Sequence, residues 1–157
     1  DTVLTRAHIA RFLMEAGYVS QMSEAFDRFL SPGCPYYIER EKVTPADAVQ
    51  LICSTGGIPI LAHPILYHFT DEKLRQLIVS LKKMGLMGIE AIYSTYSVRE
   101  EAYIRDLAAE LDLCISGGSD FHGDNKPGLD LGCGYGHLDI PYSTLDTLRE
   151  RRKNYED

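Results

Sequence analysis

The residues of this chain best suited to chemistry are a carboxylate and an imidazole two positions apart, Asp120 and His122. They follow an apolar run at residues 113–115 and two glycines, Gly117 and Gly118. A buried strand would give a rigid base, and glycines let the backbone turn sharply and approach an ion closely. One oxygen and one nitrogen ligand suit zinc, iron or manganese. A turn carboxylate beside a surface histidine has the same spacing, so both interpretations stay open at this point.

A second apolar run ends in the same way. Residues 58–62 lead directly into His63, and Pro64 then takes the chain out of regular structure. Active sites of parallel α/β sheets and barrels lie at the C-terminal ends of the strands. Two strands that each deliver a potential ligand at that end therefore favour a site formed between them.

Helices between these runs are expected to set the strands in place. Start signals, apolar residues at helical spacing and terminal glycines predict helices over residues 44–55, 70–83 and 97–111. Each is followed by an apolar run, the middle one at 88–92, so three helix–strand units and a parallel, right-handed arrangement are expected. Glu90 stands inside the middle run, where a carboxylate needs a partner, so we expect a supporting role before a ligand role.

The pattern as a whole resembles the polymerase and histidinol phosphatase (PHP) family, and more closely its small stand-alone phosphoesterases. Three segments carry the later motifs of that family: residues 57–64, 88–90 and 115–123. Residues 4–10 and 32–37 look like the helical insertion of the same subgroup. These matches touch nearly the whole chain and are specific as a set.

The resemblance implies an α/β fold, the C-terminal portion of a distorted (β/α)7-type barrel with a helical insertion at the N-terminus. Residues 1–43 would form the insertion subdomain and residues 44–157 the C-terminal half of the barrel. Family members begin with a His-x-His motif, and none of the five histidines here forms one. We therefore expect the first half of the barrel to be absent from this chain, whose first residue is Asp1 rather than methionine.

The resemblance also implies a metal site with His63, Asp120 and His122 among its ligands. Up to three divalent ions, of manganese, zinc or iron, would share the complete family site. Such ions supply a water nucleophile near neutral pH, so no side-chain nucleophile is needed and the reaction is phosphate ester hydrolysis. The family motif continues His-Pro with Gly-Arg, but Ile65 and Leu66 stand here, which removes a cation that would bind phosphate.

Four side chains are candidates for binding phosphate or substrate: Arg6, His8, Arg40 and Lys126. The first two belong to the segment that resembles the insertion, which lies over the active site in the family. Arg40 stands in a charged stretch after a proline-containing loop, and Lys126 lies six residues after Asp120. Ordinary solvated polar positions on helices and loops are the alternative for each of them.

Composition limits the other function classes. The chain has 157 residues, 45% hydrophobic and 25% charged, as expected of one globular domain. Its net charge of −7 argues against a general polyanion binder. Four cysteines show no Cys-x-x-Cys spacing, and no apolar run approaches a membrane span, so we expect a cytoplasmic protein with reduced thiols.

The sequence thus predicts a metal-dependent phosphoesterase as the parent protein, acting on phosphorylated small molecules such as nucleotides or on short oligonucleotides. This chain alone is expected to be weakly active or inactive. One alternative is an inactive remnant that binds a partner and forms homo-oligomers through an exposed barrel surface. The other is a module that binds anions without metal through Arg6, Arg40 and Lys126.

Overall fold

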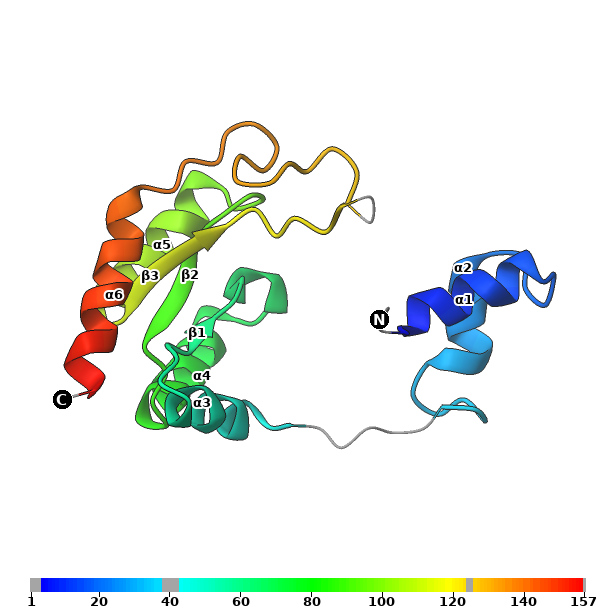
Figure 1. The fold of residues 1–157 in the computed structure, drawn as a ribbon, viewed down its shortest axis with the longest axis horizontal. Helices are drawn as coiled ribbons and strands as arrows, with labels where there is room; N and C mark the ends of the chain where they lie inside the picture. The colour runs from blue at the N-terminus through cyan, green and yellow to red at the C-terminus, as the bar shows by residue number, and fades with distance from the viewer. Residues whose placement is uncertain (1–3, 38–42, 124–125, 157) are drawn as a thin grey trace. The chain divides into compact units, whose positions relative to one another are not determined.

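The computed structural model describes residues 4–37, 43–123 and 126–156, shown as a ribbon in Figure 1. The chain divides into two compact units, Asp1–Lys42 and Val43–Asp157. Each unit has its own cluster of buried apolar side chains. Within the described residues, the first unit contains helices and no strand, and the second is a mixed α/β unit with a parallel sheet.

The helical unit contains α1 (Arg6–Glu15), α2 (Met22–Ala25) and the π-helix η1 (Phe26–Leu30). Thr5 is the N-cap of α1. Gln21 is the N-cap of α2, and just before it the Ser20 backbone N–H and hydroxyl both donate to the Glu24 carboxylate. This arrangement ties the turn to the new helix.

The core of the helical unit is small. Three residues are buried, Ala10, Val19 and Ala25, and five larger side chains pack against them while partly exposed. Small buried side chains contribute little hydrophobic stabilisation.

The sheet of the second unit consists of β1 (Ile60–Leu61), β2 (Gly88–Tyr93) and β3 (Cys114–Gly118) in the order β1-β2-β3. Both pairings are parallel, which confirms the predicted arrangement. The C-terminal ends of the three strands therefore lie at one edge of the sheet. The register between β2 and β3 shifts between Glu90 and Ile92, the sign of a β-bulge.

α3 (Pro45–Ser54) precedes β1, and α6 (Tyr142–Glu156) follows β3 in the chain. The short 3-10 helix η2 (Pro64–Tyr67) and α4 (Asp71–Lys83) connect β1 with β2, and α5 (Val98–Glu110) connects β2 with β3. The predicted start signals at Thr44 and Ser97 are confirmed, since each side chain accepts from a backbone N–H in the first turn, and Thr70 caps α4 in the same way. The apolar faces of these helices cover the sheet. Helices α3, α4 and α5 and strand β2 contribute most of the core, whose buried residues within the described chain are Val49, Leu74, Ile78, Leu81, Leu86, Ile89, Ala91, Ile104, Leu107, Ala108 and Leu113.

The two glycines after residue 115 do not form the predicted turn. β3 continues through them to Gly118. A Cβ at Gly117 would lie 2.8 Å from Ile92 Cβ, and one at Gly118 would lie 3.0 Å from Glu90 Oε1. The glycines therefore allow close packing against β2, and the left-handed residue comes later, at Asp120 with φ 58°.

A long loop, residues 119–141, leads from the end of β3 back to α6 (Figure 1). Its start is held by Ser94, whose hydroxyl donates to Ser119 O at 3.0 Å. Gly132 N donates to Ser119 Oγ at 3.3 Å. None of the helices in the described part of the chain is long and apolar enough to cross a membrane.

Candidate functional site

His63 follows β1 directly, and it is fixed by the backbone as well as by packing. It takes the left-handed conformation with φ 30° and caps η2. Its ring makes edge contacts with Tyr93 and Tyr67, at centroid distances of 5.6 Å and 6.3 Å. Its Nδ1 is buried and has no hydrogen-bond partner within the described residues. A buried nitrogen without a partner is unfavourable, so this atom is suited to a ligand.

Glu90 holds the backbone of His63. Its Oε2 accepts from His63 N–H at 2.7 Å, so a carboxylate of β2 fixes the turn at the end of β1. Burial raises the pKa of Glu90, although the His63 N–H opposes that shift. Its other oxygen has space only because residue 118 is a glycine. The predicted supporting role of Glu90 agrees with this contact.

Tyr93 connects the two strand ends. Its ring packs against His63, and its hydroxyl donates to Asp120 Oδ2 at 2.7 Å. Burial first, and then this hydrogen bond, raises the pKa of Tyr93 above its usual range. In a regular strand Glu90 and Tyr93 would face opposite sides, but the bulge between them inserts an additional residue, and both contact His63.

Asp120 is the carboxylate of the β3 end. Besides Tyr93, the Lys126 ammonium contacts Oδ2. Lys126 first and Tyr93 second lower the pKa of Asp120, so its carboxylate is ionised at neutral pH. An ionised, partly accessible carboxylate is in the state that a divalent metal requires.

His122 lies close to Asp120 on the loop after β3. Its Nδ1 is 2.7 Å from the backbone oxygen of Asp120 and 3.4 Å from Oδ1. The first distance is that of a hydrogen bond in which Nδ1–H donates to the carbonyl oxygen. Histidines that bind metals commonly donate one ring N–H to such an acceptor, which leaves the other nitrogen free. The side chain is 54% exposed, so Nε2 can be reached.

The donors at the two strand ends fit a divalent ion of the zinc, iron or manganese type. They offer one buried imidazole nitrogen without a partner, one ionised carboxylate and one exposed imidazole. Among the described residues no group of three His, Cys, Asp or Glu side chains is arranged to hold a metal. His63, Asp120 and His122 therefore do not form a complete metal site by themselves within the described residues.

The four predicted substrate-binding residues are placed differently. Lys126 contacts Asp120, at the end of β3. In the helical unit, Arg6 donates to Leu30 O at 3.2 Å, and His8 Nδ1 accepts from Thr5 N at 3.1 Å, so both stabilise local structure there. Arg40 lies outside the described residues.

Tyr93 and Ser94 are the site residues that the sequence did not reveal. They stand immediately after the predicted strand 88–92, at the position of β2 where the other two strands carry their ligands. The rule that identified His63 and Asp120, a polar side chain at a strand end, applies to this pair as well. Tyrosine is common in strands because of its high β propensity, so Tyr93 gave no separate signal of a role in the site.

Two curated relatives are about one third identical to the chain over the aligned residues. A 5′-3′ exoribonuclease of Haemophilus influenzae is 38% identical over 122 residues, 78% of this chain and 44% of the relative. A 3′,5′-nucleoside bisphosphate phosphatase of Chromobacterium violaceum is 32% identical over 130 residues, 83% of this chain and 46% of the relative. The chain thus spans about half the length of the curated relatives it matches.

A solved structure agrees with these relatives. A protein of Bifidobacterium adolescentis described as a metal-dependent phosphoesterase superposes with a TM-score of 0.64 and 28% identity, over 93% of this chain and 50% of that one. No family model matches the sequence. The names of the two curated relatives and of this structure describe enzymes, which favours the hydrolase hypothesis over both non-catalytic alternatives.

Proposed function

This chain belongs to the polymerase and histidinol phosphatase family, and we propose from that premise that it forms the C-terminal part of a metal-dependent phosphoesterase. The observation that carries the proposal is the pair of strand ends joined by Tyr93, with a partnerless buried nitrogen at one and an ionised carboxylate at the other. The substrate would be a nucleotide or a short oligonucleotide, since the relatives are named for such substrates.

His63, Asp120 and His122 would hold divalent metal together with donors from the rest of the protein. Bound metal would supply a water nucleophile near neutral pH and reduce the negative charge on the phosphate oxygens. Glu90 and Tyr93 would keep His63 and Asp120 in place while this occurs. Since the ligand set here is partial, we expect this chain by itself to have little activity.

The residues that face the substrate are part of the same proposal. Lys126 would leave Asp120 for a phosphate oxygen when metal binds, because both the ion and the ammonium compete for the same carboxylate. Arg6, His8 and Arg40 would bind phosphate or substrate, as their sequence context predicts. That unit would be the helical insertion of a distorted (β/α)7-type barrel, and the three-stranded sheet would be part of the barrel wall.

The test is metal content and hydrolysis in the full-length protein, by elemental analysis and by turnover of a nucleoside 3′,5′-bisphosphate and a 5′-phosphorylated trinucleotide. Asp120→Asn keeps the left-handed backbone but removes the charge. It should lower kcat more than about a hundredfold and reduce bound metal, because a ligand contributes more than the supporting contacts do.

Asp112→Asn is the matched control. Asp112 also has a positive φ, 47°, but its carboxylate pairs with Arg151, away from the strand ends. This variant should keep its metal and its activity. A wild-type protein that contains no metal and hydrolyses neither substrate would overturn the proposal, as would full activity in Asp120→Asn.

A further inference from the structure

A pocket of about 420 Å³ lies beside the turn that follows His63. It is formed by η2, the start of α4 and the start of α5. Six of its lining residues carry the argument: Pro64, His68, Phe69, Asp71, Arg99 and Glu100. A volume of this size is typical of small-molecule sites. Pro64, which lines the pocket, directly follows His63 in the chain, so the pocket begins one residue from a candidate metal ligand.

Aromatic rings connect this pocket with His63. The Tyr67 ring contacts the His63 ring on one side and the Phe69 ring, at 5.9 Å, on the other. Tyr96 fixes the turn between them, because its hydroxyl accepts from Ile65 N at 3.1 Å. The pocket therefore stands at a set distance from His63, on a rigid support.

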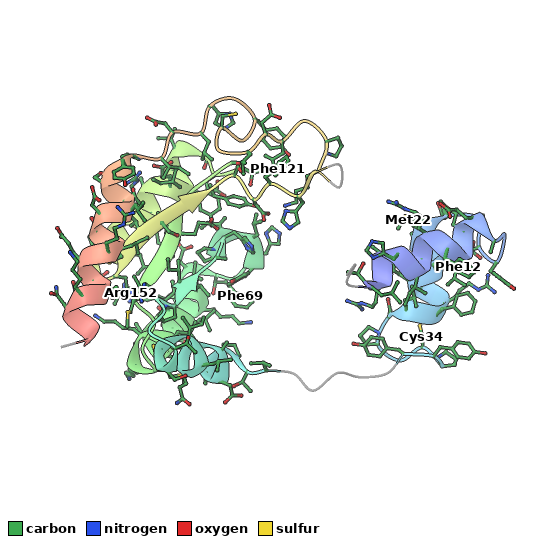
Figure 2. All side chains as sticks on the ribbon, viewed as in Figure 1. Phe12, Met22, Cys34, Phe69, Phe121 and Arg152 are labelled. Carbon is green, nitrogen blue, oxygen red and sulfur yellow. The ribbon has the colours of Figure 1, made fainter. Side chains whose placement is uncertain are left out.

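Phe69 is the apolar platform of the pocket. Phe69 is 38% exposed (Figure 2). The ammonium of Lys73 lies over one face of its ring, 4.0 Å from the centroid, and Lys73 does not line the pocket. Bases of single-stranded nucleic acids stack on exposed aromatic faces, so the other face of the Phe69 ring is the one that would take a base.

Among the charged and histidine side chains that line the pocket, hydrogen-bond donors and carboxylates are present in equal number. His68 and Arg99 are donors, and within the described residues neither side chain has a hydrogen bond or ion pair. Asp71 and Glu100 bring two carboxylates, of which Glu100 already accepts from the Ser97 N–H and hydroxyl, at 2.8 Å and 2.7 Å. This balance disfavours a phosphate and suits a flat, neutral group with hydrogen-bonding edges.

We propose that this pocket binds a nucleobase of the substrate, next to the phosphate that is hydrolysed at His63 and Asp120. The base would stack on Phe69, and its edge would meet Arg99, His68 and the free carboxylate of Asp71. The role of this subsite in hydrolysis rests on the proposed function. Because it binds the base, it would favour nucleotides over sugar phosphates as substrates. Its base-binding property does not depend on catalysis.

Phe69→Ala and Phe69→Leu test the subsite in the full-length enzyme. The substrates are a 5′-phosphorylated trinucleotide and the same trinucleotide without bases. Loss of stacking should raise KM for the intact trinucleotide between about fivefold and a hundredfold, with little change in kcat and no change for the abasic substrate. Leucine keeps the apolar volume, so both variants should behave alike if stacking is the cause.

Two further variants separate this role from a structural one. Met84→Ala removes an exposed apolar side chain at the other end of α4 and should change neither KM. Arg99→Gln should raise KM for the intact substrate alone, by less than Phe69→Ala does. Equal increases for both substrates in Phe69→Ala, or recovery in Phe69→Leu, would overturn the subsite.

Binding of adenosine to the Asp120→Asn variant separates failure of the subsite from failure of the proposed function. Adenosine has no phosphate, so neither metal nor turnover is needed. Nuclear magnetic resonance should show contacts between the base protons and the Phe69 ring, lost in the double variant with Phe69→Ala. If the wild-type enzyme hydrolyses neither substrate, adenosine binding alone tests the subsite. If millimolar adenosine changes no chemical shift of the pocket residues, the subsite is refuted.

Discussion

The two strand ends that carry the candidate ligands are held in different ways. At the end of β1, His63 is fixed by the hydrogen bond to Glu90 and by aromatic packing, and its Nδ1 is buried. At the end of β3, Asp120 lies on a loop and is held by the hydroxyl of Tyr93 and the charge of Lys126. The first end is therefore set by packing and the second by polar contacts, so different perturbations should affect each.

Gly134→Ala should have the largest effect on stability, and it acts on the β3 end. Gly134 has φ +61°, and a Cβ there would lie 2.5 Å from Ser94 Oγ, the hydroxyl that holds Ser119. A left-handed alanine and the steric clash together should lower the free energy of unfolding by about 2–4 kcal/mol. Denaturant unfolding of the metal-free protein measures this loss.

Gly128→Ala is the control for that variant. Gly128 has φ +78° but no heavy atom within 4 Å of an added Cβ, so only the backbone cost of about 1 kcal/mol applies. Equal losses for the two variants would mean that the contact with Ser94 does not hold the loop.

Tyr93→Phe sharpens the comparison, because it keeps the ring on His63 and removes only the hydroxyl from Asp120. Loss of one supporting hydrogen bond to a metal ligand should weaken metal affinity about 10- to 100-fold. Calorimetric titration of the full-length protein with Mn²⁺ or Zn²⁺ measures it. Tyr142→Phe, which removes a hydroxyl bonded to exposed Arg149, should leave affinity unchanged; a similar decrease in both would contradict the assignment.

The pKa values of Glu90 and Asp120 should be shifted in opposite directions in the metal-free protein. Burial raises the pKa of Glu90 above 4.5, so the folded chain keeps a proton that the unfolded chain has released, and stability falls as pH rises through the raised pKa. Lys126 and Tyr93 lower the pKa of Asp120 below 3.8, so its contribution is present above that pH and is lost as pH falls through the lowered pKa. The pH dependence of the carboxyl carbon resonances, followed by nuclear magnetic resonance, measures both pKa values. If Asp120 becomes protonated before Glu90 as the pH is lowered, the predicted difference between them is wrong.

Local signals in the sequence account for most of the second unit. Thr44, Thr70 and Ser97 start helices where their side chains can cap them, and the apolar runs become parallel strands. These features depend on neighbours within a few residues, so the sequence contains the whole cause. β1 is shorter than its run, because only Ile60 and Leu61 pair with β2.

The contacts that build the site could not be predicted in this way. The bulge that brings Glu90 and Tyr93 to His63 depends on how β2 pairs with β3, and no local pattern encodes it. The same is true of Gly117. A glycine is required there because Ile92 of the neighbouring strand lies too close for a side chain. The three ligands themselves remain predictions, as do the barrel and the boundary between the insertion and residue 44.

The left-handed backbone at His63 and Asp120 also limits how this site can change over generations. Four non-glycine residues of the described chain have positive φ, and all are histidine or aspartate, namely His63, His68, Asp112 and Asp120. Apart from glycine, few residue types tolerate that conformation, chiefly asparagine, aspartate and histidine. Any other residue type at these two positions would therefore add a backbone cost of about 1–2 kcal/mol to the loss of its side-chain contacts. A protein designer who replaces either residue should begin with the other members of that short set.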